Sequence, residues 1–74
     1  MSTTQVVDAR GLSCPMPAVL ARQALLKAGT GTVVEVLIDN ETSCENVARL
    51  AGREGWQVAV QAQPDGVQKL VLTR

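Results

Sequence analysis

One cysteine of this sequence lies in a context that could support chemistry. Cys14 is followed by Pro15, Met16 and Pro17, and proline is well tolerated in the first turn of a helix, where its missing N–H would have no partner. The pattern predicts a helix start with Cys14 as its N-cap. Because the two prolines donate nothing, the Met16 N–H is the donor best placed for the Cys14 sulfur. Helix N-termini favour a thiolate, so the position suits an anionic sulfur.

The spacing excludes the common dithiol motif. A Cys-x-x-Cys pair needs a second cysteine three positions on, where it can attack the first sulfur, but here that position is Pro17. A sulfur atom carried on Cys14 would therefore have no neighbour in the motif to discharge it, which suits a group destined for another molecule. The structural alternative is that Cys14 is a small apolar residue packed in a tight turn.

Residues 8–17, DARGLSCPMP, resemble the Cys-Pro-x-Pro signature of the TusA/SirA/YedF family of small bacterial sulfur-carrier proteins. The resemblance covers essentially the whole chain as a single domain, residues 1–74. The later residues Asp39-Asn40-Glu41, Asn46-Val47, Arg49 and Gly55 are closest to the YedF branch. YedF-type proteins usually continue into a second domain of a different family, and these 74 residues do not include one.

The resemblance implies a function as well as a fold. Cys14 would hold sulfane sulfur as a persulfide and relay it, as a sulfurtransferase-type carrier rather than a free-standing turnover enzyme. Its partners would be a sulfur-donor protein, such as a cysteine desulfurase or a rhodanese, and a downstream acceptor protein. The residues expected to support Cys14 are Arg10, Gly11, Leu12, Pro15, Met16 and Pro17. The alternative is a non-catalytic regulatory or interaction module, linked to selenium metabolism, that keeps the motif as a structural loop.

Two positions depart from the family pattern. Carrier members often have arginine directly before the cysteine and an acidic or amide residue between the prolines, whereas this chain has Ser13 and Met16. Arg10 could supply the positive charge instead and steer a donor or acceptor. Met16 could contact a partner protein or simply cover the turn.

Composition limits the remaining function classes. The 74 residues carry seven basic and seven acidic side chains, no histidine and one aromatic residue, Trp56. Nucleic-acid binders usually concentrate basic charge and add aromatic stacking surfaces, so direct nucleic-acid binding is not expected. Two thiols without histidine do not complete a tetrahedral zinc site, and no cofactor motif is present. No signal peptide or membrane-spanning run occurs, so we expect a cytoplasmic protein that is a monomer or a weak dimer.

Hydrophobic periodicity predicts the order β-α-β-α-β-β. Strands are expected at residues 4–8, 32–39, 57–63 and 67–73, and helices at 15–28 and 43–54. The turn 63–66 (QPDG) predicts a type I hairpin. The resemblance implies the same order arranged as a two-layer sandwich. The expected fold class is therefore α+β, with a four-stranded mixed sheet and two helices packed on one face.

The second cysteine follows a core pattern. Cys44 shares the apolar stripe of the second helix with Val47, Ala48 and Ala51, and right-handed crossovers would start both helices at one edge of the sheet. Cys44 is therefore either a packing residue or an accessory thiol that forms a redox dithiol with Cys14. On the first helix, Val19 and Leu26 lie outside the core face as shielded edge residues or as an apolar strip for a partner. Trp56 is expected to plug or cap the core.

Overall fold

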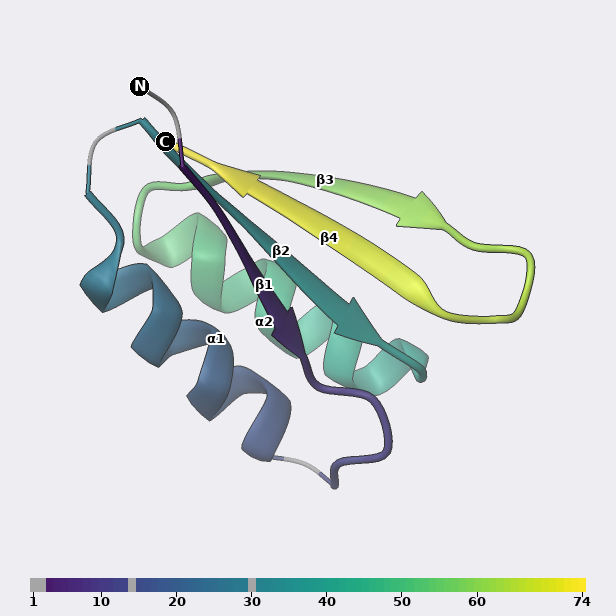
Figure 1. Cartoon of the computed structure of the whole chain (residues 1–74). Helices are drawn as coiled ribbons and strands as arrows, with labels where there is room; N and C mark the ends of the chain where they lie inside the picture. The colour runs from purple at the N-terminus through teal and green to yellow at the C-terminus, as the bar shows by residue number, and fades with distance from the viewer. Residues whose placement is uncertain (1–2, 14, 30) are drawn as a thin grey trace.

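The computed structural model describes residues 3–13, 15–29 and 31–74. One mixed four-stranded sheet is covered on one face by two helices (Figure 1). The predicted order and layering are confirmed. The elements are β1 (Thr3–Asp8), α1 (Met16–Lys27), β2 (Thr32–Ile38), α2 (Glu41–Arg53), β3 (Gln57–Ala62) and β4 (Gln68–Thr73).

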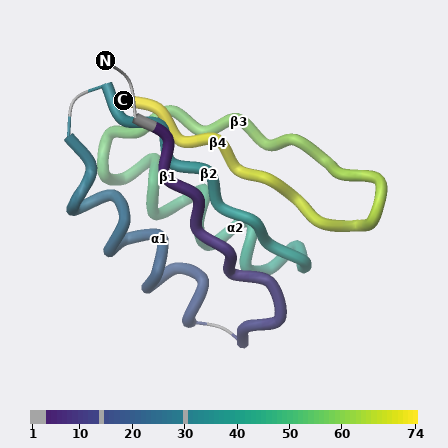
Figure 2. The backbone as a smooth tube through the Cα atoms, viewed as in Figure 1, coloured from purple at the N-terminus to yellow at the C-terminus, as the bar shows by residue number. Residues whose placement is uncertain are grey.

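The sheet has the order β1-β2-β4-β3, so β1 and β3 form its two edges. β1 pairs with β2 in parallel, with Asp8 beside Leu37, while β4 runs antiparallel to both β2 and β3. The carboxyl ends of β1 and β2 therefore lie together at one end of the sheet. The β3–β4 turn lies at the same end, because Gln68 pairs with Ile38, and the start of β1 and the end of β4 lie at the opposite end (Figure 2).

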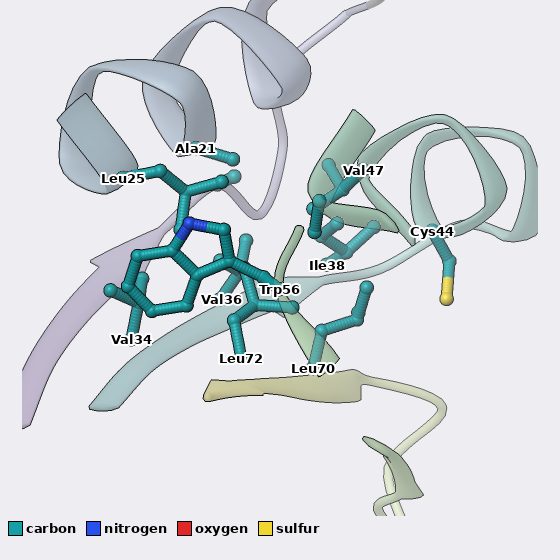
Figure 3. Packing of buried hydrophobic residues seen from close by; sticks show 12 residues of the cluster. Ala21, Leu25, Val34, Val36, Ile38, Cys44, Val47, Trp56, Leu70 and Leu72 are labelled. Carbon is teal, nitrogen blue, oxygen red and sulfur yellow. The ribbon is translucent and has the colours of Figure 1, made fainter. Parts of the chain in front are cut away.

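The core lies between the sheet and the helices. Alternate residues of the two central strands are fully buried, as the period-2 pattern predicts, and Val47 and Ala51 of α2 pack onto them. Trp56 is 5% exposed and plugs one end of this cluster, with Cys44 at the other end (Figure 3). The central-strand residues are Val34, Val36, Ile38, Leu70 and Leu72.

The β3–β4 turn follows the predicted chemistry. The Gly66 N–H donates to the Gln63 carbonyl at 3.2 Å, and the Gln63 N–H donates to the Val67 carbonyl at 2.8 Å. Gly66 has φ +85°, a conformation that glycine adopts without a Cβ penalty. The hairpin is therefore a type I turn followed by a glycine bulge.

The end of β3 near this hairpin extends beyond the cover of the helices. Val58 is half-buried against the core, but Val60 on the same face is 52% exposed. The expectation that helices cover this whole face holds for the central strands and for only the beginning of β3.

Candidate functional site

The motif loop, defined as residues 9–15, connects the carboxyl end of β1 to α1. Ala9 continues the ladder, donating its N–H to the Leu37 carbonyl at 2.9 Å, and is fully buried. Leu12 is half-buried and packs against the core. These two residues hold a loop whose other described members, Arg10, Gly11, Ser13 and Pro15, are exposed. Cys14 lies outside the described residues.

A carboxylate on β2's end fixes the turn of this loop. Asp39 Oδ2 accepts the Gly11 N–H at 2.8 Å, a contact between residues 28 positions apart in the chain. Gly11 has φ +74°, a conformation that residues with a Cβ rarely adopt. The predicted conformational role of Gly11 is therefore confirmed, and Asp39 is what holds the turn in place.

Asp39 also connects the motif loop to the second helix. Its Oδ1 accepts the Asn40 side-chain N–H at 3.4 Å, and Asn40 Oδ1 in turn accepts the Ser43 N–H at 2.8 Å. Asn40 is thus the N-cap of α2. The sequence analysis placed Asp39 at the end of the predicted strand 32–39 and in the YedF-like run, without a role in the motif loop. The signal that could have found its role is its position directly after β2, because parallel strands end at the same edge of a sheet.

The first helix begins one residue later than predicted. The helix α1 starts at Met16, and its N-cap is Pro15, without a side-chain capping hydrogen bond, rather than Cys14. The Met16 N–H donates to the Ser13 carbonyl at 2.9 Å. The prediction that this N–H is available for the Cys14 sulfur is therefore wrong, because the turn before the helix already uses it.

The two motif residues that follow Pro15 have opposite environments. Pro17, at the second helical position, is fully buried and anchors the start of α1 against the core. Met16 is 44% exposed. Of the two roles considered for Met16, the structure is compatible with contact to a partner, since its side chain is not packed into the core.

Arg10 is engaged by its own loop. Its Nε and Nη2 each donate to one oxygen of the Asp8 carboxylate at 2.8 Å, and its backbone N–H donates to Asp8 Oδ1 at 3.2 Å. Hydrogen bonds from the Arg10 side chain and backbone lower the pKa of Asp8 to about 2. The pKa of Arg10 is raised, mainly by Asp8 and further by the charges of Asp65 and Asp39. The positive charge expected of Arg10 is thus largely compensated by Asp8.

The edge that carries the motif loop is acidic. Five of the seven carboxylates lie at the ends of the strands, in the β3–β4 turn or in the first turns of α2, while most basic residues lie on the helices and near their far ends. Charge is therefore separated along a molecule with no net charge. The five carboxylates at this edge belong to Asp8, Asp39, Glu41, Glu45 and Asp65.

An open groove of about 370 Å³ adjoins the motif loop. Its sheet residues alternate with the buried Ile38 and Leu70, so it lies on the face of the sheet without helices. Arg10 lies on its loop side, Pro64 and Asp65 of the hairpin turn lie on the other, and Leu37 and Lys69 contribute from the sheet. The site is thus an exposed loop beside a shallow groove rather than an enclosed pocket.

Cys44 lies in the first turns of α2 and is 7% exposed. Burial raises the pKa of its thiol, and the neighbouring charges of Glu45 and Glu41 raise it further. A buried thiol with a raised pKa is a poor nucleophile at neutral pH. The packing interpretation of Cys44 is therefore favoured over the accessory-thiol interpretation.

Within the described residues, no three side chains of His, Cys, Asp or Glu are grouped so as to hold a metal ion. None of the helices in that part of the chain is long and apolar enough to cross a membrane. Every buried side-chain nitrogen or oxygen that the structure describes has a hydrogen-bond partner. The polar groups of the core are thus satisfied internally, and the motif loop is the main candidate for chemistry.

Comparison with known proteins identifies the family. Residues 5–74 match the family described as "Sulfurtransferase TusA". A "Putative sulfur carrier protein" of Halobacterium salinarum is 33% identical over 67 residues, covering 89% of this chain and 83% of the relative. A relative of the same description from Methanocaldococcus jannaschii is 26% identical, covering 92% and 91%.

A solved structure extends the likeness to the fold. The crystal structure of a SirA-like protein from Desulfitobacterium hafniense superposes with a TM-score of 0.85 at 33% identity, covering 97% of this chain and 95% of that one. The sequence resemblance and the four-stranded architecture are both confirmed by these comparisons, whereas the YedF branch stays a prediction. The chain belongs to the TusA family.

Proposed function

We propose that this protein is a sulfur carrier that holds sulfane sulfur as a persulfide on Cys14 and relays it between protein partners. The observation that carries the proposal is the Cys-Pro-x-Pro motif, located between β1 and α1 within a family match that spans residues 5–74. The names of the relatives support the same role. The protein would act in the bacterial cytoplasm as a carrier rather than as a free-standing enzyme.

The transfer is a pair of thiol-exchange steps. The Cys14 thiolate attacks the terminal sulfur of a donor protein's persulfide, the donor S–S bond breaks, and the donor cysteine leaves as a thiolate. Cys14 now carries the persulfide. A nucleophile of the acceptor then attacks its terminal sulfur, the S–S bond at Cys14 breaks, and the Cys14 thiolate is regenerated. One sulfane sulfur moves, and no external oxidant or reductant is consumed.

The residues around Cys14 have distinct parts in this proposal. Leu12 and Pro17 fix the two ends of the motif against the core, and Asp39 holds Gly11 so that the loop keeps one shape. The exposed side chains of Arg10 and Met16 are available to a docking protein. Because Asp8 compensates Arg10, we expect Arg10 to orient a partner by hydrogen bonding more than by long-range attraction.

The test is sulfur loading followed by intact-mass measurement. The protein is incubated with a cysteine desulfurase and L-cysteine, and Cys14→Ser is compared with the matched control Cys44→Ser. We expect the wild type and Cys44→Ser to gain the mass of one sulfur atom, reversible by dithiothreitol, and Cys14→Ser to gain none. Passage of the sulfur to an acceptor thiol should then regenerate the starting mass.

Two outcomes would reject the proposal. Absence of any sulfur adduct on the wild type, with polysulfide as well as with the desulfurase, would favour the regulatory or interaction module. An adduct that requires Cys44, or a loss of two hydrogens on mild oxidation that requires both cysteines, would favour a redox dithiol.

A further inference from the structure

The edge strand β3 has no neighbour on its outer side. It is the last strand in the order β1-β2-β4-β3, and most of its residues are exposed. Exposed sheet edges are usually protected by charge, proline or a bulge, because their unpaired N–H and C=O groups can pair with another strand. Residues 57–62, QVAVQA, contain no charged residue and no proline. This edge is therefore open to pairing.

The backbone of the hairpin shows which groups of β3 point outward. The Gln63 N–H bonds the Val67 carbonyl, so Gln63 and Val67 form a hydrogen-bonded pair at the end of the β3–β4 ladder. Such pairs alternate along antiparallel strands, and the register pairs Gln61 with Lys69 and Ala59 with Val71. The odd-numbered residues thus bond β4. The N–H and C=O groups of Val58, Val60 and Ala62 face away from it.

The sequence of this strand reads the same in both directions around Ala59. Residues 57–61 are Gln-Val-Ala-Val-Gln. An antiparallel copy centred on Ala59 therefore places Val58 opposite Val60 and Gln57 opposite Gln61. This register brings together the residues whose backbone groups point outward, and four interchain hydrogen bonds form at the two valine pairs.

The side chains fit the same register. Val58 and Val60 lie on the helix-covered face, because the register aligns them with the buried Leu72 and Leu70. Pairing would place the 52% exposed Val60 of each copy beside the partner copy's Val58. On the other face, glutamine meets glutamine, and no like charges oppose each other.

We infer that the outer edge of β3 pairs with β3 of a second copy of this chain, around a twofold axis at Ala59, to form a continuous eight-stranded sheet. The motif loop follows β1, which is the outer strand on the other side of the sheet from β3. Both copies therefore keep their motif loops open to other proteins. The interface is small, so we expect a dissociation constant of about 0.1–1 mM.

The first test is sedimentation equilibrium of the whole chain over a concentration series. Val60→Pro removes the outward N–H without removing a bond to β4, as proline is tolerated on sheet edges, and we expect it to weaken dimerisation at least tenfold. The matched control Val6→Lys alters an exposed valine on the other edge strand and should leave dimerisation unchanged. A wild type that stays monomeric up to about 2 mM would overturn the inference. So would a dimer that survives Val60→Pro in a folded protein.

A cross-linking test does not depend on Val60→Pro folding. In a Cys14→Ser background, Ala59→Cys places its thiol beside its own symmetry mate, in a non-hydrogen-bonded pair with Cα atoms about 4.5 Å apart, which permits a disulfide. Gln61→Cys on the same face would lie about 13 Å from its mate. We expect oxidation to cross-link Ala59→Cys and not Gln61→Cys. Equal cross-linking of the two variants, or none, would contradict the register.

Discussion

The two β-to-α connections lie at the same edge of the sheet and differ in construction. The second is short: Asn40 caps α2 through Ser43, and both Ser43 and Cys44 are buried in its first turn. The first is longer, has Pro15 as the N-cap of α1 without a side-chain hydrogen bond, and leaves Arg10, Gly11, Ser13 and Met16 exposed. One connection is built to close a core, and the other is built to present a loop. Each carries a cysteine.

The largest expected effect is that the two cysteines control different properties: Cys14 controls sulfur loading and Cys44 controls stability. Cys14→Ser should abolish sulfur loading and change the free energy of unfolding by less than about 0.5 kcal/mol, because its neighbours Ser13 and Pro15 are exposed. Cys44→Ser should keep loading and lose about 1–3 kcal/mol, because it buries a hydroxyl in an apolar cluster. Urea unfolding and intact mass measure the two quantities. Sulfur loading that survives Cys14→Ser would show that Cys14 is not the residue that carries the sulfur.

The second-largest expected effect is a difference in stability between variants of the two helix N-caps. Asn40→Ala removes the hydrogen bond to the Ser43 N–H and should cost about 1 kcal/mol of stability. Pro15→Ala removes no side-chain cap, so we expect a change within about 0.5 kcal/mol. Urea denaturation of both variants at neutral pH provides the measurement. Equal losses would mean that α1 depends on its proline start as strongly as α2 depends on its cap.

Asp39 bridges the two connections, and its replacement should change the rate of sulfur transfer more than the stability of the fold. Asp39→Ala removes the acceptor of the Gly11 N–H and should slow sulfur transfer about threefold to tenfold while costing only about 0.5–1 kcal/mol of stability. Asp39→Asn retains an oxygen acceptor and should recover much of the rate. Single-turnover transfer from a loaded donor gives the readout. A rate that falls equally in both variants would show that the charge, and not the hydrogen bond, matters.

The smallest effect concerns the Asp8–Arg10 pair. Since hydrogen bonds from Arg10 lower the pKa of Asp8 to about 2, the pair is complete above about pH 4 and is lost as the pH falls through about 2. A carboxyl-detected NMR titration should show this midpoint. In Arg10→Ala the midpoint should return toward the ordinary value of 3.8. A wild-type midpoint already near 3.8 would mean that Arg10 is free in solution.

The strand alternation and helical periodicity of the sequence were sufficient to predict the order of the elements and their buried faces. Val34, Val36 and Ile38 point into the core, as their spacing predicts, and Val47 and Ala51 cover them. Val19 and Leu26 fall outside the buried face of α1, as predicted, but at 40% and 71% exposure they are exposed rather than shielded at its edge. Buried faces of regular elements repeat along the chain, so one sequence is enough to locate them.

The details of the site could not be read in the same way. The helix α2 begins at Glu41 rather than Ser43, because Asn40, among several possible capping residues between 39 and 43, is the one that bonds the Ser43 N–H. The Met16 N–H donates to the Ser13 carbonyl, and the Arg10 side chain pairs with the Asp8 carboxylate. Each of these outcomes depends on which of several nearby donors and acceptors meet in space. Sequence spacing identifies the candidates but does not choose among them.

The central claim is that the first connection presents a reactive thiol while the second packs one away. Its most direct test is the alkylation rate of both cysteines in one sample across pH, resolved by peptide mass spectrometry. Burial and acidic neighbours raise the pKa of Cys44, so its alkylation rate should stay low at neutral pH and rise only in alkaline solution. Cys14 lies between the exposed residues Ser13 and Pro15, so we expect it to react faster than Cys44 at neutral pH. A Cys44 that reacts as fast as Cys14 at neutral pH would contradict the account.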